Sequence, residues 1–155
     1  MNVDRITGPL LLRTIRDLTA LRKPPPEILT LHLYQHHNSD AAKIHALECL
    51  LHDIAWDELC RLRVALDVKA AVQPATCDEL MDAVRADMQA PYRSGELFAW
   101  SALYHRYLAP ICLSSEEIAP IAGVSPRNYR RWISEGIERL AIQVQRLELA
   151  ARGDA

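Results

Sequence analysis

The sequence lacks the features by which most enzymes and membrane proteins are recognised. Only 5 of its 155 residues are glycine, and no glycine-rich phosphate loop, GxSxG or HExxH pattern occurs in it. The N-terminus carries charges on both sides of a very short apolar run, so it is neither a signal peptide nor a membrane span. We therefore expect a non-enzymatic, cytoplasmic protein with no cofactor, no catalytic residues and no membrane partner.

A large excess of positive charge is also missing. The formal net charge is −2, so a surface that binds nucleic acid would have to be local, because affinity for phosphate needs clustered Lys and Arg. The C-terminal part has such a local excess, with seven Arg against five Glu between residues 103 and 152.

Patterns that hold metal ions or disulfides are not evident. The four cysteines form no CxxC pair, and in a chain without a secretion signal they are expected to be reduced core residues. His32 and His36, and likewise His45 and Cys49, have the spacing of two ligands on one helix face, but no third ligand follows at a recognised spacing. We therefore expect no metal site.

Leu and Ala dominate the apolar residues, which favours helices over sheets. Half of the residues are hydrophobic, enough to form a core. Apolar spacing, caps and prolines predict helices over residues 9 to about 21, 27–37, 41–54, 56–68, 77–89 and 96–108. The third and fourth of these could instead form one bent helix over 41–68. The expected fold is all-α: a helical bundle in residues 1–75, for partner binding or dimerisation, and a helix-turn-helix domain with a long final helix in residues 76–155.

Residues 113–140 carry the most informative pattern. Ser114 and Glu117 form a capping box, which begins a helix. Gly123 suits the left-handed residue that ends this helix, and Ser125 followed by Pro126 begins the next one. A helix, a three-residue turn and a second helix constitute a helix-turn-helix.

A helical projection of the second helix separates two faces. One face is apolar and should dock on the rest of the chain; it comprises Tyr129, Trp132, Ile133, Gly136, Ile137 and Leu140. The other face is polar and suits contact with a DNA groove, because Arg can bind guanine and Asn adenine through two hydrogen bonds. The predicted DNA-binding residues are Ser125, Arg127, Asn128, Arg130, Arg131 and Ser134.

This stretch resembles the helix-turn-helix of sigma factor region 4 and of related response regulators. The matching residues are Glu117, Ile118, Ala119, Gly123, Val124, Ser125, Arg127, Tyr129, Gly136, Ile137 and Leu140. Residues 80–141 also resemble, more weakly, a helical domain attached to signalling ATPases of some bacteria. That similarity lies in Trp100, Tyr107 and residues 127–131. The resemblance implies a bacterial DNA-binding regulator of transcription.

Three residues depart from the resemblance. Pro120 lies inside the first helix of the pattern, where it removes a hydrogen bond at a cost of roughly 3 kcal/mol unless the helix is short, kinked or opened there. Glu135 and Glu138 border the arginines and would repel phosphate. These departures favour the alternative function, a non-enzymatic adaptor of a bacterial signalling or defence system that binds another protein through its helices.

The final helix continues an apolar series with alternating steps of four and three residues. The series comprises Ile133, Ile137, Leu140, Val144 and Leu147. One interpretation is a homodimer formed through this seam. The other is a long final helix that packs on the N-terminal half of its own chain.

Overall fold

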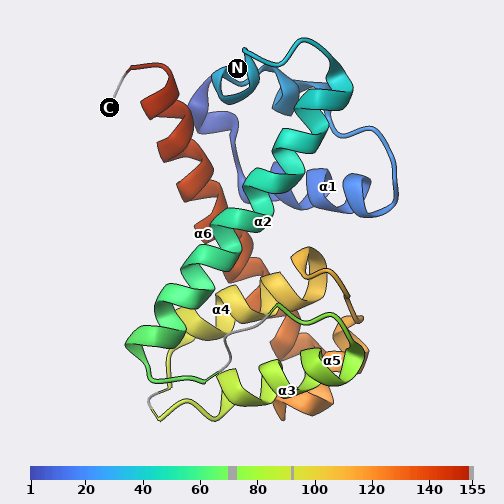
Figure 1. Cartoon of the computed structure of the whole chain (residues 1–155), viewed down its shortest axis with the longest axis vertical. Coiled ribbons are helices and arrows are strands. Elements are labelled where there is room, and N and C mark those ends of the chain that lie inside the picture. Colours follow the sequence, from blue (N-terminus) through green and yellow to red (C-terminus); the bar gives the residue numbers. More distant parts are fainter. Residues whose placement is uncertain (70–72, 92, 154–155) are drawn as a thin grey trace. The chain divides into compact units, whose positions relative to one another are not determined.

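The computed structural model describes residues 1–69, 73–91 and 93–153, and every regular element in these residues is helical (Figure 1). The α-helices are α1 (Gly8–Thr19), α2 (Asp40–Ala65), α3 (Cys77–Met88), α4 (Gly95–Leu103), α5 (Ser115–Ala122) and α6 (Pro126–Ala151). Short elements join them: the 3-10 helices η1 (Val3–Arg5), η2 (Pro26–Thr30) and η3 (His32–Tyr34), and the π-helix η4 (Tyr104–Leu108). The predicted all-α fold is confirmed.

The chain forms two compact units, and the two longest helices belong partly to each. The first unit comprises Met1–Leu51 and Ile137–Ala155, and the second comprises His52–Gly136. These units differ from the two predicted regions, 1–75 and 76–155, whose division into domains stays a prediction. Residues 40–65 form one helix, which confirms the single-rod alternative for that part of the sequence.

In the first unit, the second half of α6 holds the N-terminal segments through polar side chains. Gln145 donates from Nε2 to the carbonyl oxygen of Ile6 at 2.6 Å, and Arg152 donates to the carbonyl oxygen of Met1. The buried carboxylate of Glu148 accepts hydrogen bonds from the backbone N–H of His32 at 2.5 and 3.0 Å. Each of these bonds joins parts of the chain that are far apart in sequence.

The predicted helix over 27–37 is wrong, and the bonds to Glu148 explain why. Leu31 is extended, with ψ of 146°, and separates η2 from η3. The N–H of His32 bonds to the Glu148 carboxylate instead of to a helix carbonyl, so a tertiary contact satisfies the donor that a helix would have satisfied. His32 and His36 consequently do not share a helix face, and among the described residues no group of three His, Cys, Asp or Glu side chains could hold a metal ion.

Two other predictions about apolar positions need correction. The cysteines are free, but none is a core residue: Cys49, Cys77 and Cys112 are exposed and Cys60 is half-buried. Four of the five seam residues are buried within the single chain and are therefore not available to a second copy; these are Ile133, Ile137, Leu140 and Val144. Only Leu147 is exposed, at 38%. The interpretation that α6 packs within its own chain accounts for the seam.

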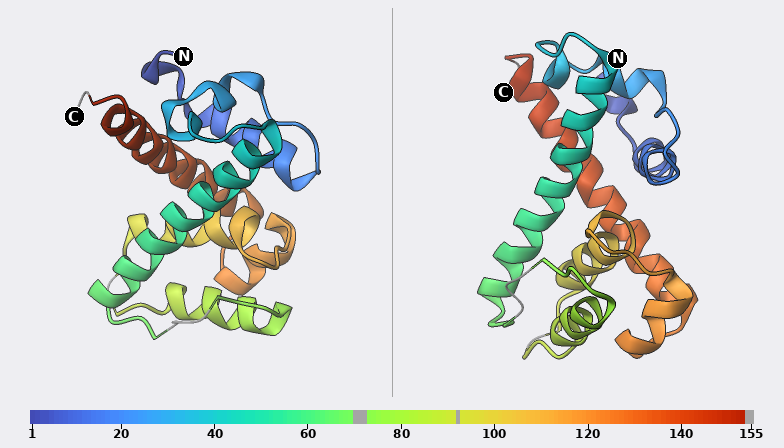
Figure 2. Two further views of the ribbon diagram at one scale, coloured as in Figure 1. Left: turned by 45° about the horizontal axis from the view of Figure 1, so that its top comes forward. Right: turned by 45° about the vertical axis from the view of Figure 1, so that its right-hand side comes forward.

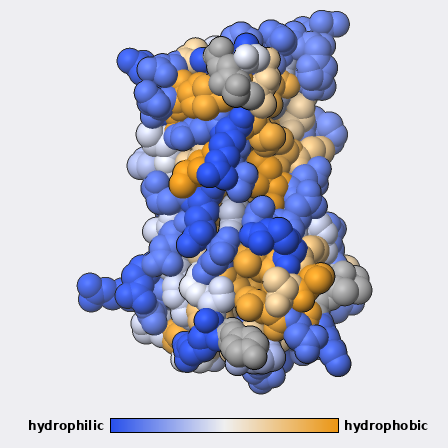
Figure 3. Space-filling model, turned by 90° about the vertical axis from the view of Figure 1, so that its left-hand side faces the viewer, coloured by the Kyte–Doolittle hydropathy of each residue, from blue (hydrophilic) through white to orange (hydrophobic). Residues whose placement is uncertain are grey.

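Polar and apolar side chains are mixed over the face of the molecule drawn in Figure 3. The most exposed large apolar side chains are Leu21, 95% exposed, and Val64, 83% exposed. Leu21 has a φ of +55°, a left-handed conformation in which glycine is usual. Among the helices that the structure describes, none is long and apolar enough to cross a membrane.

In the second unit, α3 packs against both α4 and α5, and α4 continues into the π-helix η4 (Figure 2). The first half of α6 lies beside α4 and is anchored there by aromatic side chains. The ring centroids of Trp132 and Phe98 are 4.9 Å apart, and the hydroxyl of Tyr129 lies 3.5 Å from the carbonyl oxygen of Ala102. Tyr129 and Trp132 are both buried.

Gly136 allows the close approach of α6 to α4. A Cβ atom at this position would lie 2.5 Å from the carbonyl oxygen of Ala99, which is a backbone atom and can move only with its helix. We expect Gly136→Ala to lower the free energy of unfolding by about 1–3 kcal/mol, since this overlap outweighs the better helix propensity of alanine, roughly 1 kcal/mol. Urea unfolding measures the change.

Gly95→Ala is the matched control for that substitution. Gly95 begins α4, and an added Cβ would meet nothing within 4 Å. We expect this variant to be as stable as the wild type or slightly more stable. If Gly136→Ala is as stable as Gly95→Ala or more stable, the close contact between α6 and α4 is contradicted.

Candidate nucleic-acid interface

The chain folds locally as the sequence predicts between α5 and α6. The Ser114 hydroxyl accepts from the N–H of Glu117 at 3.2 Å, and the Glu117 carboxylate accepts from the N–H of Ser114 at 3.1 Å. The hydrogen bonds from Ser114 hold the pKa of the Glu117 carboxyl below its usual range. Gly123 is left-handed, with φ of 74° and ψ of 27°, and Ser125 accepts from the N–H of Asn128 at 3.2 Å. Two helices therefore flank a three-residue connection, 123–125.

Pro120 is accommodated because α5 is short. The helix ends at Ala122, two residues after Pro120, and the proline is exposed. Its own carbonyl oxygen still accepts from the N–H of Gly123 at 3.2 Å, and that of Ala119 accepts from the N–H of Val124 at 3.1 Å. Of the three alternatives that the sequence leaves open, a short, a kinked or an opened helix, the structure has a short one.

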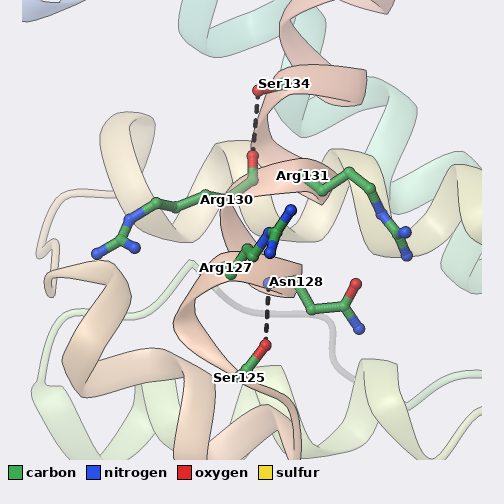
Figure 4. A pocket seen from close by; sticks show the side chains of 6 residues that line it. All are labelled: Ser125, Arg127, Asn128, Arg130, Arg131 and Ser134. Carbon is green, nitrogen blue, oxygen red and sulfur yellow. Dashed lines mark hydrogen bonds between the residues drawn. The ribbon is translucent and has the colours of Figure 1, made fainter.

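The six residues predicted to bind DNA line one open hollow on the second unit, with a volume of about 500 Å³. We call this set the arginine face; it comprises Ser125, Arg127, Asn128, Arg130, Arg131 and Ser134. The side chains spread outward from α6, with Arg130 on one side, Arg131 and Asn128 on the other and Arg127 between them (Figure 4). Asn128 is half-buried, and the other five residues are exposed. All except Ser125, which precedes the helix, belong to the first three turns of α6.

The three arginines differ in their partners within the chain. Arg130 forms an ion pair with Glu116 of α5, and both side chains are more than half exposed. Neither Arg127 nor Arg131 pairs with an acidic side chain among the residues that the structure describes, and both are exposed. An exposed pair contributes little to stability and is easily exchanged for another anion. Two arginines are therefore open to an anionic ligand, and the third can be released.

Glu116 is the residue that sequence reasoning missed at this site. Its pairing with Arg130 depends on how α5 and α6 are placed in space, and no spacing rule links positions 14 residues apart on two helices. Glu135 and Glu138, which were predicted to border the arginines, are both exposed, but the Glu138 carboxylate lies against Gly8 at the start of α1. The Glu116 carboxylate therefore reduces the local positive charge of the arginine face.

A buried polar network holds the scaffold under this interface. Arg63 of α2 binds Asp87 of α3 through two hydrogen bonds of 2.8 and 2.9 Å, and both side chains are at most 2% exposed. The hydroxyl of Ser101 on α4 donates to the same carboxylate at 2.5 Å. His105, fully buried in η4, donates from Nδ1 to the carbonyl oxygen of Ser101 at 2.8 Å. Four elements of the second unit are thereby joined.

His105 is suited to be neutral. Burial lowers its pKa to about 4, with Asp87 opposing and Arg63 reinforcing this change. Its Nε2 atom is buried and has no hydrogen-bond partner among the described residues, so a proton there would be a buried donor without an acceptor. Since its ordinary pKa is about 6.5, the unfolded chain takes up this proton at a higher pH than the folded chain does.

We expect stability to fall on acidification because of His105. The contribution of His105 to the free energy of unfolding is fully present above its pKa in the unfolded chain, about 6.5, and is lost as the pH falls toward its pKa in the folded chain, about 4. The loss amounts to about 3 kcal/mol between pH 7 and pH 4. The difference in unfolding free energy between the wild type and His105→Asn, measured by urea unfolding at several pH values, isolates this histidine from other acid-titrating groups. If the difference in unfolding free energy between the two proteins does not change with pH, His105 is not the group that makes stability fall on acidification.

No family model matches the sequence, and no significant match was found among curated proteins or solved structures.

Proposed function

We propose that this chain binds double-stranded DNA through the arginine face and acts as a transcriptional regulator, with α5 and α6 as its helix-turn-helix. The observation that carries the proposal is the division of α6 into two sides. Tyr129 and Trp132 fix the helix to α4, while Arg127 and Arg131 extend outward without an acidic partner in the described part of the chain. A helix held in this way can enter the major groove with its guanidinium groups directed at base edges and phosphates.

The pairing of Arg130 with Glu116 favours a second function. A protein surface that mixes both signs of charge also suits a polar protein partner, and the chain as a whole has a formal net charge of −2. An adaptor that binds another protein, as part of a bacterial signalling or defence system, is therefore the competing proposal. It predicts no affinity for duplex DNA that depends on the arginine face.

A titration with fluorescent duplex DNA of mixed sequence tests the first proposal. If two or three phosphates are neutralised, the affinity should fall by about ten- to forty-fold between 50 and 200 mM salt. Absence of salt-dependent binding would contradict the proposal and leave the adaptor function as the better account.

A further inference from the structure

Arg93 is linked to α6 through two successive ring contacts, although it lies before α4 in the sequence. It immediately precedes Ser94, whose hydroxyl caps α4 by accepting from the N–H of Leu97 at 3.2 Å. The Arg93 guanidinium carbon lies 5.5 Å from the centroid of the Phe98 ring. That ring is in turn 4.9 Å from the ring of Trp132.

The position of Trp132 on α6 gives the direction in which Arg93 lies. Trp132 is four residues after Asn128, so these two side chains are neighbours on one face of the helix, and Arg131 is three residues after Asn128 on its other side. Figure 4 shows Asn128 and Arg131 extending to one side of α6 and Arg130 to the opposite side. The two ring contacts therefore connect Arg93 to Trp132, which lies one helical turn from Asn128 of the arginine face.

The guanidinium of Arg93 is available and partly ordered. The side chain is exposed and forms no ion pair within the described residues. Its contact with Phe98 is a cation–π interaction, which restricts the planar group while leaving its N–H edges open to an acceptor. An arginine held in this way loses less conformational freedom on binding a phosphate than a fully mobile one does.

We propose that Arg93 is a phosphate-binding residue of the DNA interface, which contacts the sugar-phosphate backbone beside the groove that α6 enters. This inference rests on the proposed DNA-binding function. Because Arg93 precedes α4 and is linked to α6 only through Phe98 and Trp132, rather than projecting from the outward face of α6, it meets the backbone at the groove edge and not the base edges. Such a contact fixes the orientation of the protein on the duplex and carries no sequence preference.

The test compares Arg93→Ala with the wild type in salt-dependent titrations of two unrelated duplexes. We expect the affinity for both duplexes to fall by the same factor, about three- to ten-fold, and the slope of log affinity against log salt to become smaller in size by about 0.9. Arg93→Lys should keep the slope because it keeps the charge.

Arg85→Ala is the matched control. Arg85 is an exposed arginine of the same unit that pairs with Asp82 within α3, so its removal changes the net charge equally. Its salt slope should equal that of the wild type. If the wild type binds DNA and Arg131→Ala weakens that binding, but Arg93→Ala has the slope of Arg85→Ala, the role of Arg93 is refuted and DNA binding stands. If the wild type itself shows no salt-dependent binding, the proposed function and this inference are both refuted.

Discussion

Replacing both Arg127 and Arg131 by alanine is expected to reduce the affinity for duplex DNA by at least about thirtyfold. Each arginine that contacts a base edge or a phosphate contributes about 1–3 kcal/mol, and a factor of ten corresponds to 1.4 kcal/mol. Both side chains are exposed and no ion pair with them is found in the described part of the chain, so their removal breaks no salt bridge seen there. A mobility-shift titration at low salt measures the loss.

The control for this variant removes the same charge elsewhere. Arg16 of α1 and Arg146 of α6 are exposed and lie in the first unit, outside the arginine face. Arg16→Ala combined with Arg146→Ala should leave the affinity within about threefold of the wild type, because only long-range attraction is reduced. Equal losses in the two double variants would show that overall charge, and not the arginine face, governs binding.

Asp87→Ala is expected to have the largest effect on stability, lowering the free energy of unfolding by about 3–5 kcal/mol. The Arg63 guanidinium would remain buried but lose the carboxylate that accepts two of its hydrogen bonds. The Ser101 hydroxyl would lose the same acceptor. Urea or thermal unfolding measures the change.

Asp82→Ala serves as the matched control on the same helix. The Asp82 side chain is 78% exposed and pairs only with the exposed Arg85 in the described structure. Exposed pairs of this kind contribute less than about 1 kcal/mol. If Asp87→Ala lowers the free energy of unfolding no more than Asp82→Ala does, the buried network does not hold the second unit together.

Local chemistry made the α5–α6 region predictable from sequence. The Ser114–Glu117 capping box, the left-handed Gly123 and the Ser125 cap each involve residues at most three positions apart, and the structure has all three. The two faces of α6 followed from helical periodicity, since its apolar residues from Tyr129 to Leu140 are buried.

Contacts between distant parts of the chain could not be predicted in this way. The helix expected over 27–37 fails because Glu148, more than one hundred positions away, accepts from the N–H of His32. Glu116 and Arg130, like Arg63 and Asp87, meet only because separate helices pack together. A single sequence contains no local signal for such pairs. For the same reason it did not indicate that Arg93 stacks on Phe98 beside Trp132.

The central claim is that the arginine face of α6 contacts DNA, and an NMR titration of the labelled protein with a short duplex tests it most directly. We expect the largest shifts in the amide signals of residues 125–134 and in the side-chain Nε signals of Arg127 and Arg131, while signals of α1 stay unchanged. Saturating duplex that leaves these signals in place, or shifts only residues outside the second unit, would contradict the account.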